Sequence, residues 1–303
     1  MVGEEPKGSS FSVENYANYG GEMEVNEYKY SVLMSVYEND KPDYLVQAIE
    51  SMLRQTVAPE QYVIVVDGPV SEELRIAILK YQNNENIFTV IWLKGNGGLA
   101  NALNVGLEHC RNELVARMDA DDISLPTRCE RELEYFNNNH ELVICGCNID
   151  EFYGTPDNIR TSRVVPVDYQ AIRKFMRKRQ PFNHPTVMYK KSKVMEAGGY
   201  KKLKRKEDFD LFSRMLSREY YASNIDESLY LYRANEDNYA RRKSWQNFKS
   251  AIYVYWLHFM RKGCSLFDYA VICCAELLFL LLPCKLMKRL SDRLLRKSKE
   301  THG

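Results

Sequence analysis

Short apolar segments alternate strictly with amphipathic segments between residues 30 and 118, and this alternation constrains the fold most strongly. The apolar segments YSVLMSV, YVIVVD, FTVIWLK and ELVARM have the length of strands, and each is followed by polar residues. The stretches YLVQAIESMLRQT, SEELRIAILKYQ and LANALNVGLEHC lie between them and read as helices. This order predicts βαβ units and therefore a mostly parallel sheet with helices on both faces.

Polar side chains gather where each expected strand ends. Glu38 and Asp40 follow the first strand, and Asp67 ends the second. Asn96 and its neighbouring glycines follow the third strand, and three aspartates beginning at Asp119 follow the fourth. In open α/β sheets ligands bind at the carboxyl ends of the strands. The sequence therefore predicts a ligand site along this edge.

The stretch ELVARMDADDISLP, residues 113–126, carries the densest negative charge of these strand ends. Because strand side chains alternate between faces, Asp119 and Asp121 are expected to point the same way and Asp122 the opposite way. Two such carboxylates repel unless a cation lies between them, and a hard divalent ion such as Mg²⁺ or Mn²⁺ takes oxygen ligands. The alternative is a solvated turn in which Asp122 and Ser124 cap a helix. The motif alone leaves both open.

Composition excludes some classes of protein. The chain has 303 residues, of which 45% are hydrophobic, so the bulk of it can bury a sizeable core. A formal net charge of +1 gives no general case for binding nucleic acid. The cysteines lack paired CxxC spacing and indicate reduced thiols in a cytosolic protein. Residues 1–27 are polar, without the apolar core of a signal peptide, and are interpreted as a flexible leader.

The second half of the chain is less regular. Residues 142–153 are predicted as a strand, 167–180 as a helix and 183–191 as an extended segment. Gly198 and Gly199 are expected to end one helix, and another is expected from Asp208 to Leu216. Residues 244–260 form a predicted helix whose aromatic stripe is interpreted as core packing; its members are Phe248, Ile252, Trp256 and Phe259.

The C-terminal segment differs in kind from the rest. Residues 267–283 are strongly apolar but contain Asp268 and Glu276, and the run is shorter than the roughly 20 residues of a spanning helix. Residues 285–299 predict an amphipathic helix with leucines on one face and many lysines and arginines on the other. This pattern favours attachment to an anionic membrane surface. Docking on the protein's own core is the alternative.

Five motifs in order resemble those of the inverting glycosyltransferases of family 2. They are SVLMSVYEND, VIVVDGP, GNGGLANALNVGL, ARMDADD and GGYKKLKRKEDFDL, and the resemblance covers roughly residues 30–245. It implies the nucleotide-sugar-binding GT-A fold over residues 28–245, with a nucleotide-sugar half at 28–125 and an acceptor half at 126–245. The C-terminal pattern adds a membrane-associating helical segment at 246–303. Within the family, the VDGP and ARMDADD variants resemble enzymes that build bacterial exopolysaccharide, capsule or O-antigen repeat units.

The resemblance also implies roles for the residues at the strand ends. The residues expected to hold the nucleotide base are Val36, Tyr37, Glu38 and Asp67. Those expected near the ribose and diphosphate are Asn96, Gly98 and Leu99. Asp119 matches the first carboxylate of the family's DXD motif, near ribose or metal, and Asp121 matches its direct metal ligand. Arg117 precedes Asp119 by one strand period, so it faces the same way and could balance the carboxylates or contact the nucleotide.

The segment Lys206-Glu207-Asp208 matches the place of the family's catalytic base, which takes a proton from the acceptor. Asp208 is the expected base and Glu207 the second choice. The alternative is an acidic helix N-terminus, with Glu207 and Asp210 only capping. A histidine that many relatives have after Tyr232-Arg233 is missing here, so an arginine, Arg233 first, is expected to grip the diphosphate.

These expectations combine into one function. The chain is expected to be a cytoplasmic enzyme on the inner face of the bacterial membrane that uses Mn²⁺ or Mg²⁺. It would transfer one sugar, galactose or glucose, from a UDP-sugar to a lipid-linked or oligosaccharide acceptor. The basic runs Arg173–Arg179 and Lys201–Lys206 would suit a diphosphate-linked lipid, although solvated surface is the simpler interpretation. The alternatives are a sugar-nucleotide nucleotidyltransferase and an inactive binding protein of the same fold.

Overall fold

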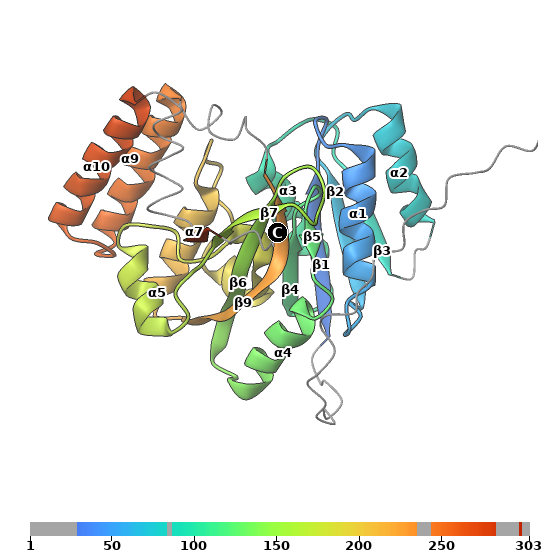
Figure 1. Ribbon diagram of the computed structural model, residues 1–303, viewed down its shortest axis with the longest axis horizontal. Coiled ribbons are helices and arrows are strands. Elements are labelled where there is room, and N and C mark those ends of the chain that lie inside the picture. Colours follow the sequence, from blue (N-terminus) through green and yellow to red (C-terminus); the bar gives the residue numbers. More distant parts are fainter. Residues whose placement is uncertain (1–28, 84–86, 235–243, 283–296, 299–303) are drawn as a thin grey trace, which may run out of the picture.

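The computed structural model describes residues 29–83, 87–234, 244–282 and 297–298. The predicted leader, residues 1–27, lies outside the described residues. The described chain forms one large sheet covered by helices, with a pair of helices at one end of the molecule (Figure 1). The seven cysteines that the structure describes are free thiols.

The first half of the described chain is built from parallel strands, as the alternation predicts. The strands are β1 (Tyr30–Val36), β2 (Gln61–Val66), β3 (Phe88–Trp92) and β4 (Leu114–Met118). They pair in the order β3-β2-β1-β4, with every contact parallel. The helices between them are α1 (Pro42–Leu53), α2 (Glu72–Gln82) and α3 (Leu99–His109). Parallel pairing brings all four carboxyl ends to one edge.

The sheet carries helices on both faces because its strands are apolar on both. In β1, Val32 and Met34 pack in the core with α1 and α2, whereas Leu33 packs on the other side with α3. Such strands, buried on both faces, read as continuous apolar runs. This arrangement confirms the predicted fold class.

The second half makes the sheet mixed. Its strands are β5 (Ile123–Ser124), β6 (Leu142–Phe152), β7 (Ile159–Arg163), β8 (Met188–Lys190) and β9 (Tyr221–Arg233). β8 lies antiparallel between β4 and β6, and β9 runs parallel to β6 along most of its length. The strand predicted at 142–153 is confirmed as β6. The sequence analysis did not predict β7 and β9, because their apolar and polar residues follow no simple alternation.

The helices of the second half connect its strands. They are α4 (Arg128–Asn138), α5 (Tyr169–Met176), the short 3₁₀ helix η1 (His184–Thr186), α6 (Lys191–Glu196) and α7 (Glu207–Leu216). Gly198 and Gly199 both have positive φ angles, 88° and 60°, and follow α6 as predicted. The helix expected at 167–180 is shorter than predicted, since α5 ends at Met176.

Two antiparallel helices, α9 (Trp245–Met260) and α10 (Leu266–Leu281), form a hairpin at one end of the molecule (Figure 1). The prediction that the aromatic stripe of the first helix packs in the core is wrong. Trp256 is 42% exposed and contacts Tyr269 of α10, whereas the buried face of α9 carries Ala251, Val254 and Tyr255. These smaller or amphipathic side chains fit against the domain, and the stripe falls beside the partner helix.

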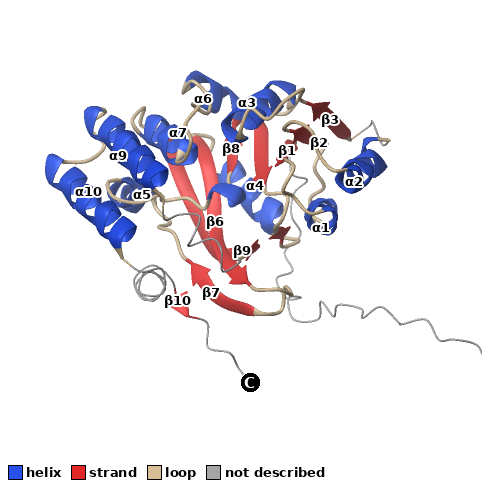
Figure 2. Ribbon diagram, turned by 90° about the horizontal axis from the view of Figure 1, so that it is seen from above, coloured by secondary structure: helices blue, strands red, loops and turns tan. Residues whose placement is uncertain are grey.

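Among the helices that the structure describes, none combines the length and apolarity that a bilayer crossing needs. Most of the amphipathic helix predicted at 285–299 lies outside the described residues. The two residues of it that the structure describes differ from the prediction, because Lys297 and Ser298 form β10, a short strand antiparallel to β7 (Figure 2). There, pairing with a sheet edge overrides the helical pattern.

Candidate active site

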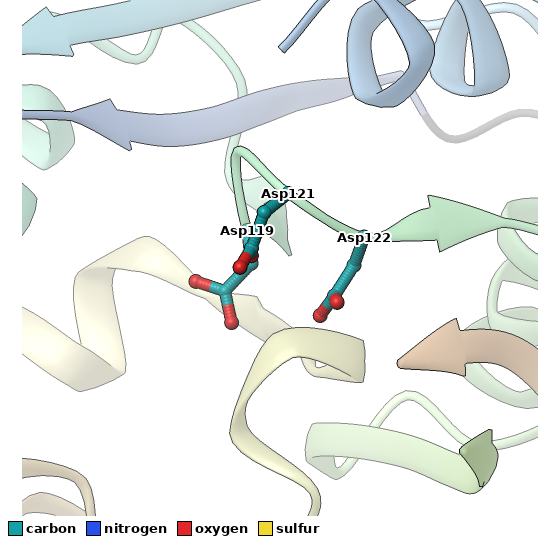
Figure 3. Close-up of side chains that lie close together, drawn as sticks. All are labelled: Asp119, Asp121 and Asp122. Carbon is teal, nitrogen blue, oxygen red and sulfur yellow. The ribbon is translucent and has the colours of Figure 1, made fainter. Parts of the chain in front are cut away.

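The three aspartates after β4 lie together at the carboxyl edge of the sheet. One carboxylate oxygen from each of Asp119, Asp121 and Asp122 lies within 4.8 Å of the others. Their side chains point to the same side of the loop (Figure 3). The prediction that Asp122 points away is wrong because β4 ends at Met118 and a turn at Ala120 and Asp121 interrupts the strand alternation.

Asp122 does not cap a helix, as the alternative interpretation proposed. α4 begins only at Arg128, and no side chain caps it. Asp122 Oδ1 instead accepts a hydrogen bond from the Arg233 main-chain nitrogen at 2.7 Å. Its other oxygen is buried and has no hydrogen-bond partner among the described residues. An orphaned buried carboxylate oxygen is costly unless a cation or a proton satisfies it.

Burial and crowding raise the pKa values of two of these carboxylates. Burial, followed by the negative charge of Asp119, raises the pKa of Asp121 to about 6. Burial, followed by the charges of Asp121 and Asp119, raises the pKa of Asp122 well above its ordinary value. A cluster that resists full ionisation in this way fits a hard divalent cation, which takes carboxylate oxygens as ligands and compensates their charge.

Asp40, which the sequence analysis placed among the polar residues at the strand ends, is a fourth carboxylate near this cluster. It follows β1, and its Oδ2 accepts a hydrogen bond from the Tyr37 main-chain nitrogen at 2.9 Å. Burial, with a smaller contribution from Asp121 and Asp119, raises the pKa of Asp40 to about 7. The signal that identifies it is its position at the carboxyl end of the strand beside β4.

Arg117 places a buried positive charge beside the acidic cluster. Its guanidinium lies 2.5 Å from Asp119 Oδ1, and its side chain is 3% exposed. The prediction that Arg117 and Asp119 face the same way is therefore confirmed. Nε and Nη1 of Arg117 are buried without hydrogen-bond partners among the described residues. A buried guanidinium with unused donors is suited to an anionic ligand.

Arg233 reaches the cluster from the end of β9. Its Nε donates to the main-chain oxygen of Asp121 at 2.7 Å, and its Nη2 donates to Gln47 Oε1 at 2.9 Å. The guanidinium also lies 3.7 Å from the centre of the Tyr44 ring. Arg233 is therefore held beside Asp121 by several contacts, and its positive charge counters the rise in the pKa of Asp121.

The turn after β1 and the end of β2 form the part of the edge that was assigned to the nucleotide base. Val36 is buried, and its oxygen accepts a hydrogen bond from the Asp67 nitrogen at 2.7 Å. Tyr37 and Glu38 are exposed beyond it. The structure therefore brings Val36, Tyr37, Glu38 and Asp67 to neighbouring strand ends.

Asp67 holds the glycine-rich loop in place. Its two carboxylate oxygens accept hydrogen bonds from the nitrogens of Gly97 and Gly98, at 2.7 and 2.8 Å. Asn96 is exposed, and its Oδ1 accepts a longer bond of 3.1 Å from Gly98. The adjoining Leu99 is half-buried and begins α3. Each Asp67 oxygen keeps a second acceptor position, so a base contact remains compatible with this anchoring.

The acidic pair lies at the start of α7. Asp208 Oδ2 accepts a hydrogen bond from Gln180 Nε2 at 2.9 Å, and its Oδ1 accepts one from the Phe209 nitrogen at 2.8 Å. Burial, followed by the charge of Asp208, raises the pKa of Glu207 to about 7. Gln180 is a positioning residue that the sequence analysis missed, because no motif signals a contact across so many residues.

The interpretation of this segment as an acidic helix N-terminus holds in part, because Glu207, Asp208 and Asp210 all lie in the first turn of α7, but none of them supplies the cap. Lys206, with a φ of 63°, is the N-cap and makes no side-chain capping bond. Asp210 is buried in ion pairs with Arg214 and Arg261, each at 2.9 Å. Asp208 and Glu207 therefore stay available at the surface of the helix end, while Asp210 stabilises the packing behind them.

The positive charge of Arg117 links the two acidic groups. It acts on Asp121 and also on Glu207, where it opposes the rise in each pKa. Burial, followed by the charge of Arg117, also holds the pKa of His184 well below its ordinary value. His184 Nε2 and the Tyr200 hydroxyl are 3.0 Å apart. The charge of Arg117 therefore acts on both the cluster after β4 and the pair on α7.

A mixed α/β sheet with carboxylates at the end of β4 and an acidic pair on a later helix is the arrangement of a GT-A glycosyltransferase. The model of the family described as "Glycosyl transferase family 2" matches residues 31–204. The chain therefore belongs to glycosyl transferase family 2, as its motifs predict, and it is a glycosyltransferase.

The chain is similar to curated relatives over most of their length. It is 34% identical to the amylovoran biosynthesis glycosyltransferase AmsE of Erwinia amylovora, over 87% of this chain and 98% of that protein. It is 36% identical to the UDP-Gal:alpha-D-GlcNAc-diphosphoundecaprenol beta-1,3-galactosyltransferase of Escherichia coli, over 71% of this chain and 77% of that protein.

Solved structures confirm the fold. A mannosyltransferase from Pyrobaculum calidifontis, determined in complex with GDP-Man and Mn²⁺, superposes with a TM-score of 0.60 at 14% identity. The alignment covers 89% of this chain and 77% of that one. At this identity the likeness establishes the common fold, and the roles of single residues depend on this chain's own geometry.

Proposed function

We propose that this glycosyltransferase moves a single hexose, galactose or glucose, from a UDP-sugar to a lipid-linked acceptor during bacterial surface polysaccharide synthesis, with inversion at the anomeric carbon. The observation that carries the proposal is the pairing of two acidic groups around Arg117. One group can hold the cation and diphosphate, and the other can accept a proton. The relative from Escherichia coli, whose name specifies UDP-Gal and a diphosphoundecaprenol acceptor, supports this choice of substrates.

The donor side uses the carboxyl edge of the sheet. The turn at Val36, Tyr37 and Glu38 and the end of β2 at Asp67 would receive the uracil base. The loop at Asn96, Gly98 and Leu99, fixed by Asp67, would lie against the ribose and diphosphate, where the absence of a side chain on glycine allows close approach. Arg117 and Arg233 would contribute positive charge near the phosphates.

The carboxylates after β4 fit a divalent cation, Mn²⁺ or Mg²⁺. Asp121 and Asp119 would hold it, and Asp122 has a buried oxygen without a partner that could join them. When bound, the cation stabilises the negative charge that develops on the departing nucleoside diphosphate. The complex of the Pyrobaculum mannosyltransferase with Mn²⁺ supports a divalent cation in proteins of this fold.

The acceptor side uses the start of α7. Asp208 would take the proton of the acceptor hydroxyl as its oxygen bonds to the anomeric carbon and the bond from that carbon to UDP breaks. Gln180 fixes one Asp208 oxygen and so orients the other part of the carboxylate. Glu207, with its pKa raised to about 7, is the second choice as base.

The acceptor is proposed to reach the site from the cytoplasmic face of the membrane. Lys206, the residue before the acidic pair, binds Glu276 of α10 at 3.0 Å. The hairpin of apolar helices therefore lies next to the acceptor side of the site. A lipid-linked acceptor held at a bilayer would present its sugar there.

The first test is calorimetric titration of the protein with UDP, with and without Mn²⁺. Binding is expected to require the cation and to be lost in Asp121→Ala, because the diphosphate would lose its compensating charge. Asp157→Ala, which removes an exposed carboxylate from a loop, is the control and is expected to bind as the wild type does. UDP binding that is indifferent to both the cation and Asp121 would contradict the proposed donor site.

A further inference from the structure

A second charged feature lies toward the C-terminal end of α7, away from Glu207 and Asp208 at its start. It is a cavity of about 680 Å³ between α5, α7 and the turn that joins α9 to α10. Its cationic side chains are Arg173, Lys174, Arg177, Arg261 and Lys262, and Glu219 is its single carboxylate. The function derived above does not use this cavity.

Some of the cations in the cavity are neutralised and others are not. Arg177 pairs with Asp268 at 2.5 Å, and Arg261 pairs with Asp210 at 2.9 Å. Arg173, Lys174 and Lys262 have no carboxylate within 4.0 Å among the described residues. Nη1 of Arg261 is buried and makes no hydrogen bond to the described residues. The cavity thus keeps excess positive charge and an unused guanidinium donor, which match a phosphate group.

The helices beside the cavity expose an unusual amount of apolar surface. Of the fifteen large apolar side chains that the described residues expose, ten lie on α9 and α10. Phe267 is 73% exposed and Leu281 is 67% exposed. The same surface includes Trp256 and Met260 on α9. So many exposed apolar side chains on one surface indicate that a membrane or another protein covers it.

Charge and shape together favour a bilayer as that partner. α10 has 16 residues, which is shorter than the roughly 20 that span a membrane, so the hairpin suits the interface rather than the bilayer core. Tryptophan side chains such as Trp256 favour the lipid headgroup level. Of the unpaired cations, Lys262 lies at the turn of the same hairpin, and Arg173 and Lys174 line the same cavity from α5, so that phospholipid phosphates would be within reach of all three.

We infer that the cavity between α5, α7 and the α9–α10 turn binds the phosphate of an anionic membrane phospholipid while the apolar face of the hairpin enters the headgroup region. The inference rests on the proposed membrane location and assigns it to particular residues. The phosphate lies near Arg173, Lys174, Lys262 and Arg261. The lipid's acyl chains run along the exposed face of α10. This site is separate from the one that holds UDP.

Vesicle flotation of the full chain tests the site. The protein is expected to float with vesicles of phosphatidylglycerol in phosphatidylcholine, and more weakly with phosphatidylcholine alone. Lys174→Glu with Lys262→Glu is expected to reduce partitioning onto the anionic vesicles about tenfold or more, because each cation near the surface contributes to attraction. If the glutamates disturb folding, Lys174→Gln with Lys262→Gln takes their place. A smaller loss of partitioning is then expected.

A matched control reverses two charges on the opposite end of the molecule. Arg75 and Lys80 are exposed on α2, far from the hairpin (Figure 1). Arg75→Glu with Lys80→Glu is expected to leave flotation unchanged. If the control variant and the cavity variant lost flotation equally, binding to anionic vesicles would depend on overall charge and not on the cavity. That result would overturn the proposed site.

Two further outcomes separate this inference from its rivals. Inorganic phosphate at millimolar concentration is expected to compete weakly with vesicles; tight binding of free phosphate without vesicle binding would identify a soluble anion as the ligand.

Phe267→Asp with Leu278→Asp is expected to abolish flotation. If it instead converted a dimer to a monomer, with no vesicle binding by the wild type, the face would be an interface between copies. UDP binding in each variant is expected to stay unchanged, so failure here leaves the donor site unaffected.

Discussion

At the scale of single residues, the site depends on carboxylates whose surroundings give them different properties. Burial, followed by repulsion from the neighbouring carboxylates, raises the pKa values of Asp121 and Asp122. Asp208 is oriented by Gln180, whereas Glu207 next to it has a pKa raised to about 7. Asp208 therefore has an oriented carboxylate, whereas Glu207 resists ionisation near neutral pH.

This difference predicts unequal effects of removing the two charges. Asp208→Asn is expected to reduce the rate of sugar transfer by about 10²–10⁴-fold, because the variant cannot take the acceptor proton. UDP affinity is expected to stay within a few-fold of the wild type. Glu207→Gln, the matched neighbour, is expected to lose far less activity. Initial rates with a radiolabelled UDP-sugar measure the activity of both variants. A larger loss of activity in Glu207→Gln would assign the base to Glu207 instead of Asp208.

At the scale of elements, the loop after β3 shows how backbone contacts shape the donor site. Gly68 has a φ of 94°, and a Cβ added to it would lie 2.7 Å from the nitrogen of Asn96. The close approach of these two turns lets Asp67 reach Gly97 and Gly98. The conformation of the loop is therefore set by the neighbouring strand end.

Gly68→Ala is expected to weaken UDP binding and to destabilise the protein by about 1–3 kcal/mol, through left-handed strain and displacement of the loop. Gly95→Ala is the control in the same loop, because its added Cβ would have no atom within 4 Å. Thermal unfolding and UDP titration of both variants measure the two effects. Equal behaviour of the two variants would mean that the contact with Asn96 does not hold the loop.

At the scale of the whole molecule, a small number of ion pairs join the helical hairpin to the domain. Asp268 at the start of α10 pairs with Arg177 at 2.5 Å and with Lys178 at 3.2 Å. Burial tends to raise the pKa of Asp268. Hydrogen bonds from Ser265 and contacts with Arg177 and Lys178 outweigh that effect and hold the pKa well below its ordinary value. The hairpin is also tied to the active site through Lys206 and Glu276.

A depressed pKa means that the ionised Asp268 stabilises the folded state at neutral pH. That stabilisation is present above the unfolded pKa of about 3.9 and is lost as pH falls below it. Asp268→Asn is expected to lower the free energy of unfolding by about 1–3 kcal/mol at pH 7, and by less as the pH falls below about 4. Urea unfolding at several pH values, with exposed Asp43→Asn as control, measures this. A difference independent of pH would exclude the ionic mechanism.

The sequence predicted those features that depend on local patterns. Alternating apolar segments predicted β1 to β4 and the helices between them, because each pattern repeats within a few residues. Motif order predicted the family and the positions of Asp121 and Asp208. Predictions failed where a pattern was extended past the end of its element. The alternation of β4 was applied to Asp122 beyond Met118, and helical spacing was applied across Lys297 and Ser298, which lie in a strand.

The sequence by itself thus determined the strand-and-helix order and the acidic motifs, because burial periodicity and charge are written along the chain. Only the tertiary structure decided which distant groups meet. Arg233 bonds to Asp121, and Gln180 orients Asp208, because β9 and the segment after α5 are brought beside them. Such contacts form where long-range packing buries polar groups that must then find partners, and no local period specifies which partner each group finds.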